Sequence, residues 1–149
     1  MMIALAADHG GFSLKEEIAN YLKDKRILFH DYGTYNESSI NYPEVVKEPC
    51  EAIVKGKADK GIFVCGTGIG ISIAANKYNG IRAACVTEAF SAALSREHND
   101  ANVLCLGGRI LSPAYAFSII DAFLDTEFSF GERHQQRIDM ITMIEESQK

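Results

Sequence analysis

The sequence has no tryptophan, only three prolines and no hydrophobic run near the ~20 residues that a membrane-spanning helix needs. Its apolar first residues, 1–7, lack a basic flank and are followed by Asp8, so we expect neither a signal peptide nor a membrane anchor. Basic residues are also scarce, because 15 lysines and arginines face 20 acidic residues and give a formal net charge of −5. This charge disfavours non-specific binding to nucleic acid or to an anionic membrane surface.

Closely spaced cysteines are missing as well. The four cysteines lie at positions 50, 65, 85 and 105 and form no C-x-x-C pair, which excludes a zinc ribbon and a thioredoxin motif. Cys85 and Cys105 lie inside apolar runs, which favours a role as small core residues. The four histidines show no metal-binding spacing. We therefore expect a cytoplasmic protein with reduced thiols, no metal ion and no other cofactor.

What the chain does contain is a regular alternation of short apolar runs and helical patterns. Its 149 residues, 47% of them hydrophobic and 23% charged, suit a single globular domain over residues 1–149. Apolar runs predict strands at 3–7, 27–29, 61–65, 81–86 and 102–106. Strand–helix alternation predicts parallel strands, hence an α/β fold: a three-layer Rossmann-like sandwich, with a five-stranded parallel sheet, helices on both faces and an extra C-terminal helix.

Three details of the helices can be predicted from local signals. Ser13 and Glu16 form a capping-box pattern at the start of the first helix. Pro49 should kink a helix over about 44–55. The last helix, about 135–146, is apolar over much of its circumference and needs a partner surface. That surface is either a second copy of the chain, which would make a homodimer, or the helix's own sheet.

The most informative loop is Cys-Gly-Thr-Gly-Ile-Gly at 65–70, which joins a buried strand to a helix start. Three glycines allow the backbone to aim several amides at one point, which suits an anion. The spacing fits neither a Walker loop nor a dinucleotide fingerprint, and Ile71 stands where a cysteine phosphatase needs arginine. A helix N-terminus stabilises a cysteine thiolate, so Cys65 is a candidate thiolate. The alternative is an inert buried cysteine beside a simple turn.

Basic residues near predicted element ends would complete a phosphate site. Arg133 and Arg137 are four residues apart on one face of a helix start, where cations are normally disfavoured. A guanidinium fork suits a phosphate dianion. His9 and His98 also fall at predicted element ends, and we expect this pair to lie near the candidate thiolate, whereas His30, inside a strand, looks structural.

Four separated blocks of the sequence share their residues with one known family. These blocks are Ala-Asp-His-Gly-Gly at 7–11, the segment 65–77 that begins with the glycine-rich loop, Ser-Arg-Glu-His-Asn-Asp-Ala-Asn at 95–102, and Gly-Glu-Arg-His-Gln-Gln-Arg at 131–137. With these blocks in this order, the chain resembles the ribose-5-phosphate isomerase B family, which also includes galactose-6-phosphate and allose-6-phosphate isomerases.

The resemblance implies an aldose–ketose isomerase that interconverts ribose 5-phosphate and ribulose 5-phosphate through an enediolate. It implies Cys65 as general base, Thr67 as a hydrogen-bond donor to the reacting end and His98 as the acid that opens the sugar ring. The implied enediolate cradle consists of Gly66, Gly68, Ile69 and Gly70, and the implied hydroxyl ligands are Asp8 and Asn99. The implied phosphate ligands are His9, Arg109, Arg133 and Arg137, the last two from a neighbouring subunit.

Two alternatives to this function remain open at this point. One is a hexose 6-phosphate isomerase acting on allose or galactose 6-phosphate, since the depth of the sugar pocket cannot be obtained from the sequence. The other is a nucleotide-binding module on a flavodoxin-like sheet, in which the glycine loop holds phosphates and Cys65 has no role. The expected partners are a phosphorylated sugar and a second copy of the chain, in a homodimer or a dimer of dimers, with neither nucleic acid nor membrane.

Overall fold

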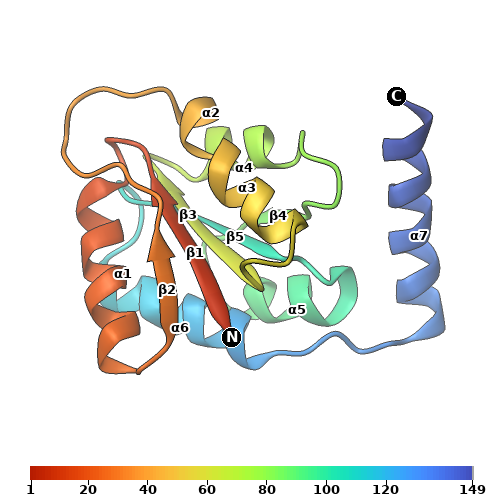
Figure 1. Ribbon diagram of the computed structural model, residues 1–149. Helices are drawn as coiled ribbons and strands as arrows, with labels where there is room; N and C mark the ends of the chain where they lie inside the picture. The colour runs from red at the N-terminus through yellow and green to blue at the C-terminus, as the bar shows by residue number, and fades with distance from the viewer. Residues whose placement is uncertain (149) are drawn as a thin grey trace.

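A five-stranded, wholly parallel sheet forms the centre of the computed structural model, which describes residues 1–148 (Figure 1). The strands are β1 (Met2–Ala7), β2 (Leu28–Asp31), β3 (Lys60–Cys65), β4 (Ala83–Cys85) and β5 (Val103–Gly107). They lie in the order β2-β1-β3-β5-β4. The helices are α1 (Phe12–Asp24), α2 (Tyr42–Val45), α3 (Lys47–Val54), α4 (Ile69–Ala75), α5 (Ala89–Asn99), α6 (Pro113–Asp125) and α7 (Glu132–Ser147). The predicted α/β sandwich with an extra C-terminal helix is confirmed.

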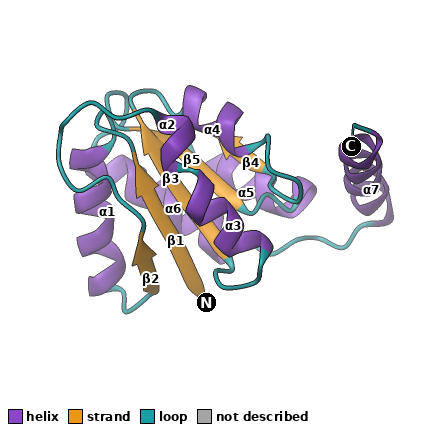
Figure 2. Cartoon of the chain, turned by 45° about the horizontal axis from the view of Figure 1, so that its top comes forward, coloured by secondary structure: helices purple, strands orange, loops and turns teal. Residues whose placement is uncertain are grey.

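Helices cover both faces of the sheet, which explains why its strands read as continuous apolar runs. Helices α1, α5 and α6 pack on one face, and α2, α3 and α4 pack on the other (Figure 2). Successive residues of β1 alternate between these layers, since Ile3 and Leu5 join the first core and Ala4 and Ala6 join the second. The three central strands, β1, β3 and β5, therefore each contribute to two separate hydrophobic cores.

The order of the strands places a crevice between β1 and β3. The chain leaves β1 toward β2 on one side and returns to pair β3 with β1 on the other. In open α/β sheets, ligands bind at the carboxyl ends of strands where the direction of winding reverses in this way. The loops that follow β1 and β3 are 8–11 and 65–70, the two segments that carry Asp8 and Cys65.

The start of α1 differs from the capping-box prediction. The helix begins at Phe12 with Gly11 as its N-cap residue, so Ser13 lies inside the first turn and caps nothing. A Cβ added to Gly11 would lie 2.4 Å from the carbonyl oxygen of Val64. The start of the helix is therefore set by a close contact between the loop 8–11 and strand β3, which the local pattern at Ser13 and Glu16 does not contain.

The predicted kink at Pro49 is also wrong. The chain breaks at Val46, between α2 and α3, and Pro49 lies in the first turn of α3. A proline is tolerated there because the amide that it lacks would have no partner within the helix.

The last helix stands apart from the rest of the fold. Figures 1 and 2 show α7 beside the molecule at the end of an extended segment, 126–131. Ile138 is buried, but the other large apolar side chains of α7 are exposed: Met140, Ile141, Met143 and Ile144. The helix therefore does not dock on its own sheet. None of the helices in residues 1–148 is long and apolar enough to cross a membrane.

A buried ion pair joins α1 to the end of β2. The side chain of Lys15 is 0% exposed, and its Nζ donates to Asp31 Oδ2 at 2.5 Å and to Glu16 Oε1 at 2.9 Å. The second oxygen of Asp31 accepts a hydrogen bond from the Gly33 amide at 2.8 Å. Since a buried ammonium without a partner is costly, this contact fixes where β2 ends and where the following loop begins.

We predict that Asp31→Ala lowers the free energy of unfolding by about 3 kcal/mol, because it leaves the charge of Lys15 buried beside Glu16 alone. Adding Lys15→Met, which removes that charge at similar side-chain volume, should regain most of the lost free energy of unfolding. Urea unfolding of the two variants and the parent checks this. A double variant less stable than Asp31→Ala would contradict the role given to the ion pair.

Candidate active site

Three loops pack backbone against backbone at the carboxyl ends of β1, β3 and β5. They are 8–11, 65–70 and 107–109. A Cβ on Gly108 would lie 2.7 Å from the Gly10 carbonyl oxygen, and one on Gly10 would lie 3.0 Å from the Gly66 amide nitrogen. The Gly108 amide donates to the carbonyl of Cys65 at 2.8 Å. Glycine is required here because no side chain fits between the loops.

Cys65, the last residue of β3, lies where the glycine-rich loop begins. It is 4% exposed, and its Sγ accepts a hydrogen bond from the Gly68 amide at 3.1 Å. Gly68 has a φ of +80°, which turns the chain sharply enough to direct this amide at the sulfur. Thr67 lies exposed at the tip of the turn, and its Oγ1 accepts from the Ile69 amide at 3.3 Å. The loop therefore presents a sulfur, an amide and a hydroxyl at one place.

The other three thiols lie outside the glycine-rich loop. Burial raises the pKa of the Cys50 thiol to about 12 and raises the pKa of Cys105 well above its ordinary value. Desolvation, followed by the nearby Cys65, raises the pKa of Cys85. The prediction that Cys85 is a core residue is wrong, since Cys85 is exposed at the end of the short edge strand β4. Its Sγ lies 3.9 Å from the Thr67 carbonyl oxygen. Cys105 is a core residue as expected.

A cavity of about 420 Å³ opens beside the three loops. Four of the predicted site residues, Asp8, His9, Gly66 and Arg109, line it together with residues 39–43. The Asp8 carboxylate is held by the Gly11 amide at 3.1 Å, and the Arg109 side chain lies over Gly66. A phosphorylated molecule in this cavity would meet a guanidinium, an imidazole and a carboxylate.

One wall of the cavity, residues 39–43, is missing from the predicted site. The Ile40 amide donates to His9 Nδ1 at 3.3 Å, which leaves the other ring nitrogen of His9 free to face a ligand. The Tyr42 ring packs on the glycine loop, because a Cβ on Gly70 would lie 2.8 Å from a ring carbon. Within the polar stretch 36–43, the Tyr-Pro pair signals only a helix start, so no local pattern identifies this wall.

The remaining predicted site residues form a second group at the opposite edge of the sheet: His98, Asn99, Arg133 and Arg137. Helix α5 begins after β4 at the carboxyl edge of the sheet and runs back to the amino edge. The residues just after α5 mark that edge, because the Asn102 carbonyl accepts a hydrogen bond from the Gly61 amide at the start of β3. The expectation that His98 lies beside the thiolate is therefore wrong within one chain.

This second group includes a histidine that the predicted site lacks. The rings of His98 and His134 have their centroids 4.3 Å apart, and Ser129 Oγ lies 2.8 Å from His134 Nδ1. Arg133 and Arg137 are exposed on the first turns of α7, and neither forms an ion pair in the part of the chain that the structure describes. The two guanidinium groups are thus available to an anion.

The predicted chemistry is divided between two places on one chain. The carboxyl edge holds a thiol, an amide-lined loop and a cavity with a basic side chain. The amino edge holds a possible acid, His98, and two guanidinium groups. Among residues 1–148, no three histidine, cysteine, aspartate or glutamate side chains are grouped so that they could hold a metal ion. We call these the carboxyl-edge half-site and the amino-edge half-site.

Comparisons with known proteins agree on one family. A family model described as ribose/galactose isomerase matches residues 3–141. The chain is 46% identical to ribose-5-phosphate isomerase B of Escherichia coli, over 97% of this chain and 96% of that protein. The structure of ribose-5-phosphate isomerase B from Clostridium thermocellum, at 46% identity, superposes with a TM-score of 0.97 and covers all of both chains. The enzyme from Mycoplasma genitalium, solved with bound ribulose 5-phosphate, is 40% identical with a TM-score of 0.91 over 97% of this chain and 96% of that one. This chain belongs to the ribose/galactose isomerase family.

Proposed function

We propose that this chain is a cytoplasmic aldose–ketose isomerase that interconverts ribose 5-phosphate and ribulose 5-phosphate. The observation that carries the proposal is the Cys65 sulfur, hydrogen-bonded to the Gly68 amide beside a cavity that Asp8 and Arg109 line. The names of the relatives and the ribulose 5-phosphate bound to one of them support the substrate. The free thiols of the chain suit the reducing cytoplasm.

The reaction needs one base and one place for a developing negative charge. In the proposal, the Cys65 thiolate removes the proton from C2 of the open-chain aldose, and the C1 oxygen becomes the oxyanion of an enediolate. Backbone amides of the loop 66–70 and the Thr67 hydroxyl stabilise that oxygen. The Cys65 thiol then returns the proton to C1, while the proton of the C2 hydroxyl moves to the C1 oxygen. No electron is gained or lost overall, so no redox cofactor is required.

Ring opening and part of the phosphate binding require residues of the amino-edge half-site. His98 would protonate the ring oxygen as its bond to C1 breaks, while the C1 hydroxyl loses its proton to solvent and becomes the aldehyde. His9 and Arg109 would hold the phosphate from one side, and Arg133 and Arg137 from the other. Because His98 and these two arginines lie at the opposite edge of their own sheet, we propose that a second copy supplies them.

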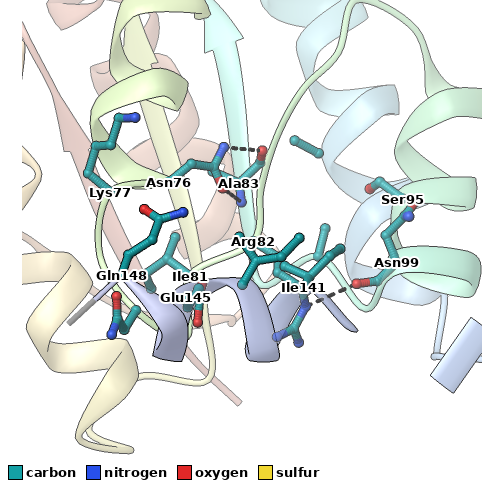
Figure 3. A pocket seen from close by; sticks show the side chains of 14 residues that line it. Asn76, Lys77, Ile81, Arg82, Ala83, Ser95, Asn99, Ile141, Glu145 and Gln148 are labelled. Carbon is teal, nitrogen blue, oxygen red and sulfur yellow. Dashed lines mark hydrogen bonds between the residues drawn. The ribbon is translucent and has the colours of Figure 1, made fainter. Parts of the chain in front are cut away.

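A groove between α7 and the rest of the chain supports such a homodimer. It encloses about 740 Å³, with Ile141, Ile144 and Glu145 on the α7 side and Ile81 and Arg82 on the other (Figure 3). Two of the exposed apolar side chains of α7, Ile141 and Ile144, line this groove. In the proposal, α4 of the second copy enters it, because α4 carries exposed isoleucines at 69 and 73 next to its own Cys65 loop. A two-fold arrangement would complete two sites at once, and a dimer of dimers would repeat it.

The first test is the substrate. We expect turnover with ribose 5-phosphate to exceed that with allose 6-phosphate or galactose 6-phosphate by about tenfold or more, since a pocket fitted to five carbons discriminates against a longer sugar. A coupled assay of the three sugars under one set of conditions measures this. Faster turnover of either hexose phosphate would replace ribose 5-phosphate as the proposed substrate.

The second test is the base. Cys65→Ala should lower kcat by about a hundredfold or more with little change in melting temperature, because it removes the only proposed proton acceptor. Cys50→Ala is the matched control, since that thiol belongs to α3 and is buried in the core, and its variant should lose stability while keeping its kcat. Near-parental kcat in Cys65→Ala would exclude Cys65 as the base.

The third test is the shared site. Arg137→Ala should raise KM for ribose 5-phosphate far more than it lowers kcat, because Arg137 binds a group remote from the reacting carbons. Mixing Arg137→Ala chains with Cys65→Ala chains should recover part of the activity, since a hybrid dimer rebuilds one site with both residues intact. Mass spectrometry of differently tagged chains checks that subunits exchange. Exchange without recovery would show that Arg137 serves its own chain.

A further inference from the structure

His134 lies at the amino-edge half-site, and the proposed reaction gives it no role. Its ring lies against that of His98, with centroids 4.3 Å apart and planes inclined by 39°. His98 is at the last turn of α5, and His134 is in the first turn of α7. This contact therefore joins two elements that otherwise meet little, at the residue proposed to act as the ring-opening acid.

Ser129 fixes the ring of His134 from the other side. Its Oγ lies 2.8 Å from His134 Nδ1 and accepts a hydrogen bond from the Gly131 amide at 3.2 Å. Its own amide donates to the Glu97 carbonyl at 3.0 Å, which ties the segment before α7 to the end of α5. With the Gly131 amide as donor to Oγ, the hydroxyl proton of Ser129 is free to point at Nδ1, which places the ring proton of His134 on Nε2.

The charges around the pair favour a neutral His134. Desolvation, followed by His98, Arg133 and Arg137, lowers the pKa of His134 from its ordinary value, and Glu97 opposes this shift. Glu97 Oε1 also lies 3.8 Å from His98 Nε2. Two imidazoles in contact repel each other when both are charged, so a neutral His134 is the state that does not oppose an acid at His98.

We propose that His134 is a positioning residue for His98: its ring, held by Ser129, packs against the His98 ring and fixes its orientation. The inference rests on the proposed function and extends it to a residue that acts through His98. His98 then meets the sugar in one orientation.

The two directions of the reaction separate this role from a structural one. Ribose 5-phosphate is mostly a ring, whereas ribulose 5-phosphate is open, because the hydroxyl that would close its five-membered ring carries the phosphate. Only the reaction that starts from ribose 5-phosphate therefore needs an acid that opens the ring. A defect in His98 positioning should therefore slow the aldose direction selectively.

The experiment compares kcat in both directions for His134→Ala. We expect a fall of about tenfold or more with ribose 5-phosphate and of less than about threefold with ribulose 5-phosphate. His134→Phe, which restores a flat ring, should regain most of the aldose activity. Ser129→Ala, which removes one hydroxyl, should also lower kcat more with ribose 5-phosphate than with ribulose 5-phosphate, but by a smaller factor. This variant tests the inference if His134→Ala does not fold. His30→Ala, at an exposed histidine packed on Tyr32, is the matched control and should change neither direction.

A pH profile gives a second readout. His134→Lys places a permanent charge beside His98, so the proton leaves His98 more easily and the high-pH limb of the aldose-direction profile should move to lower pH. An unmoved profile, or equal losses in both directions for His134→Ala and Ser129→Ala, would overturn the positioning role.

Proton exchange separates this inference from the proposed function itself. In deuterium oxide, NMR follows the loss of the C1 proton of ribulose 5-phosphate, which needs the base but no ring opening. Exchange should persist in His134→Ala and vanish in Cys65→Ser. Persistence in Cys65→Ser would overturn the proposed base, whereas loss in His134→Ala would overturn the positioning role alone.

Discussion

All five strands of this sheet run parallel, so every strand ends at one edge and every returning helix ends at the other. The site depends on this polarity. It gathers the loops after β1, β3 and β5 into one crevice, where Asp8, Cys65 and Arg109 meet. The same polarity places His98, at the end of α5, at the opposite edge of the sheet. No adjustment of side chains within one chain can reverse that separation.

The division explains several otherwise unrelated features. Helix α7 stands away from its own sheet with isoleucines and methionines exposed, at the end of an extended segment. Arg133 and Arg137 occupy its first turns, where the helix dipole disfavours cations and no acidic side chain among the described residues pairs with them. A second copy seated between α7 and the body would cover the apolar surface and provide an anion, the substrate phosphate, for the arginines. The proposed homodimer would thus account for the helix, the groove and the charges that lack a partner among the described residues.

Local patterns in the sequence predict much of this structure, because they record what each segment buries. Alternating strands and helices, the Cys65 loop and the free arginines at 133 and 137 all follow from residue type and spacing. Features that depend on contacts between distant segments do not. The burial of Lys15 requires Asp31 to arrive beside it, and the start of α1 requires Val64 to meet Gly11. The cavity wall at 39–43 and the contact of His98 with His134 likewise come from packing rather than periodicity. The sequence places His98 at a predicted helix end, and the family resemblance implies its role as an acid, but neither reveals at which edge of the sheet it lies.

In the proposed enzyme, one reaction site combines the carboxyl-edge half-site of one copy with the amino-edge half-site of another. A crystal structure of this protein with ribulose 5-phosphate bound would show whether the two half-sites meet. We expect the phosphate within hydrogen-bond distance, roughly 2.7–3.2 Å, of Arg109 from one copy and of Arg137 from the second, with the C1 and C2 carbons facing the Cys65 sulfur. A ligand held wholly by one chain, or bound with its reacting carbons turned away from Cys65, would contradict it.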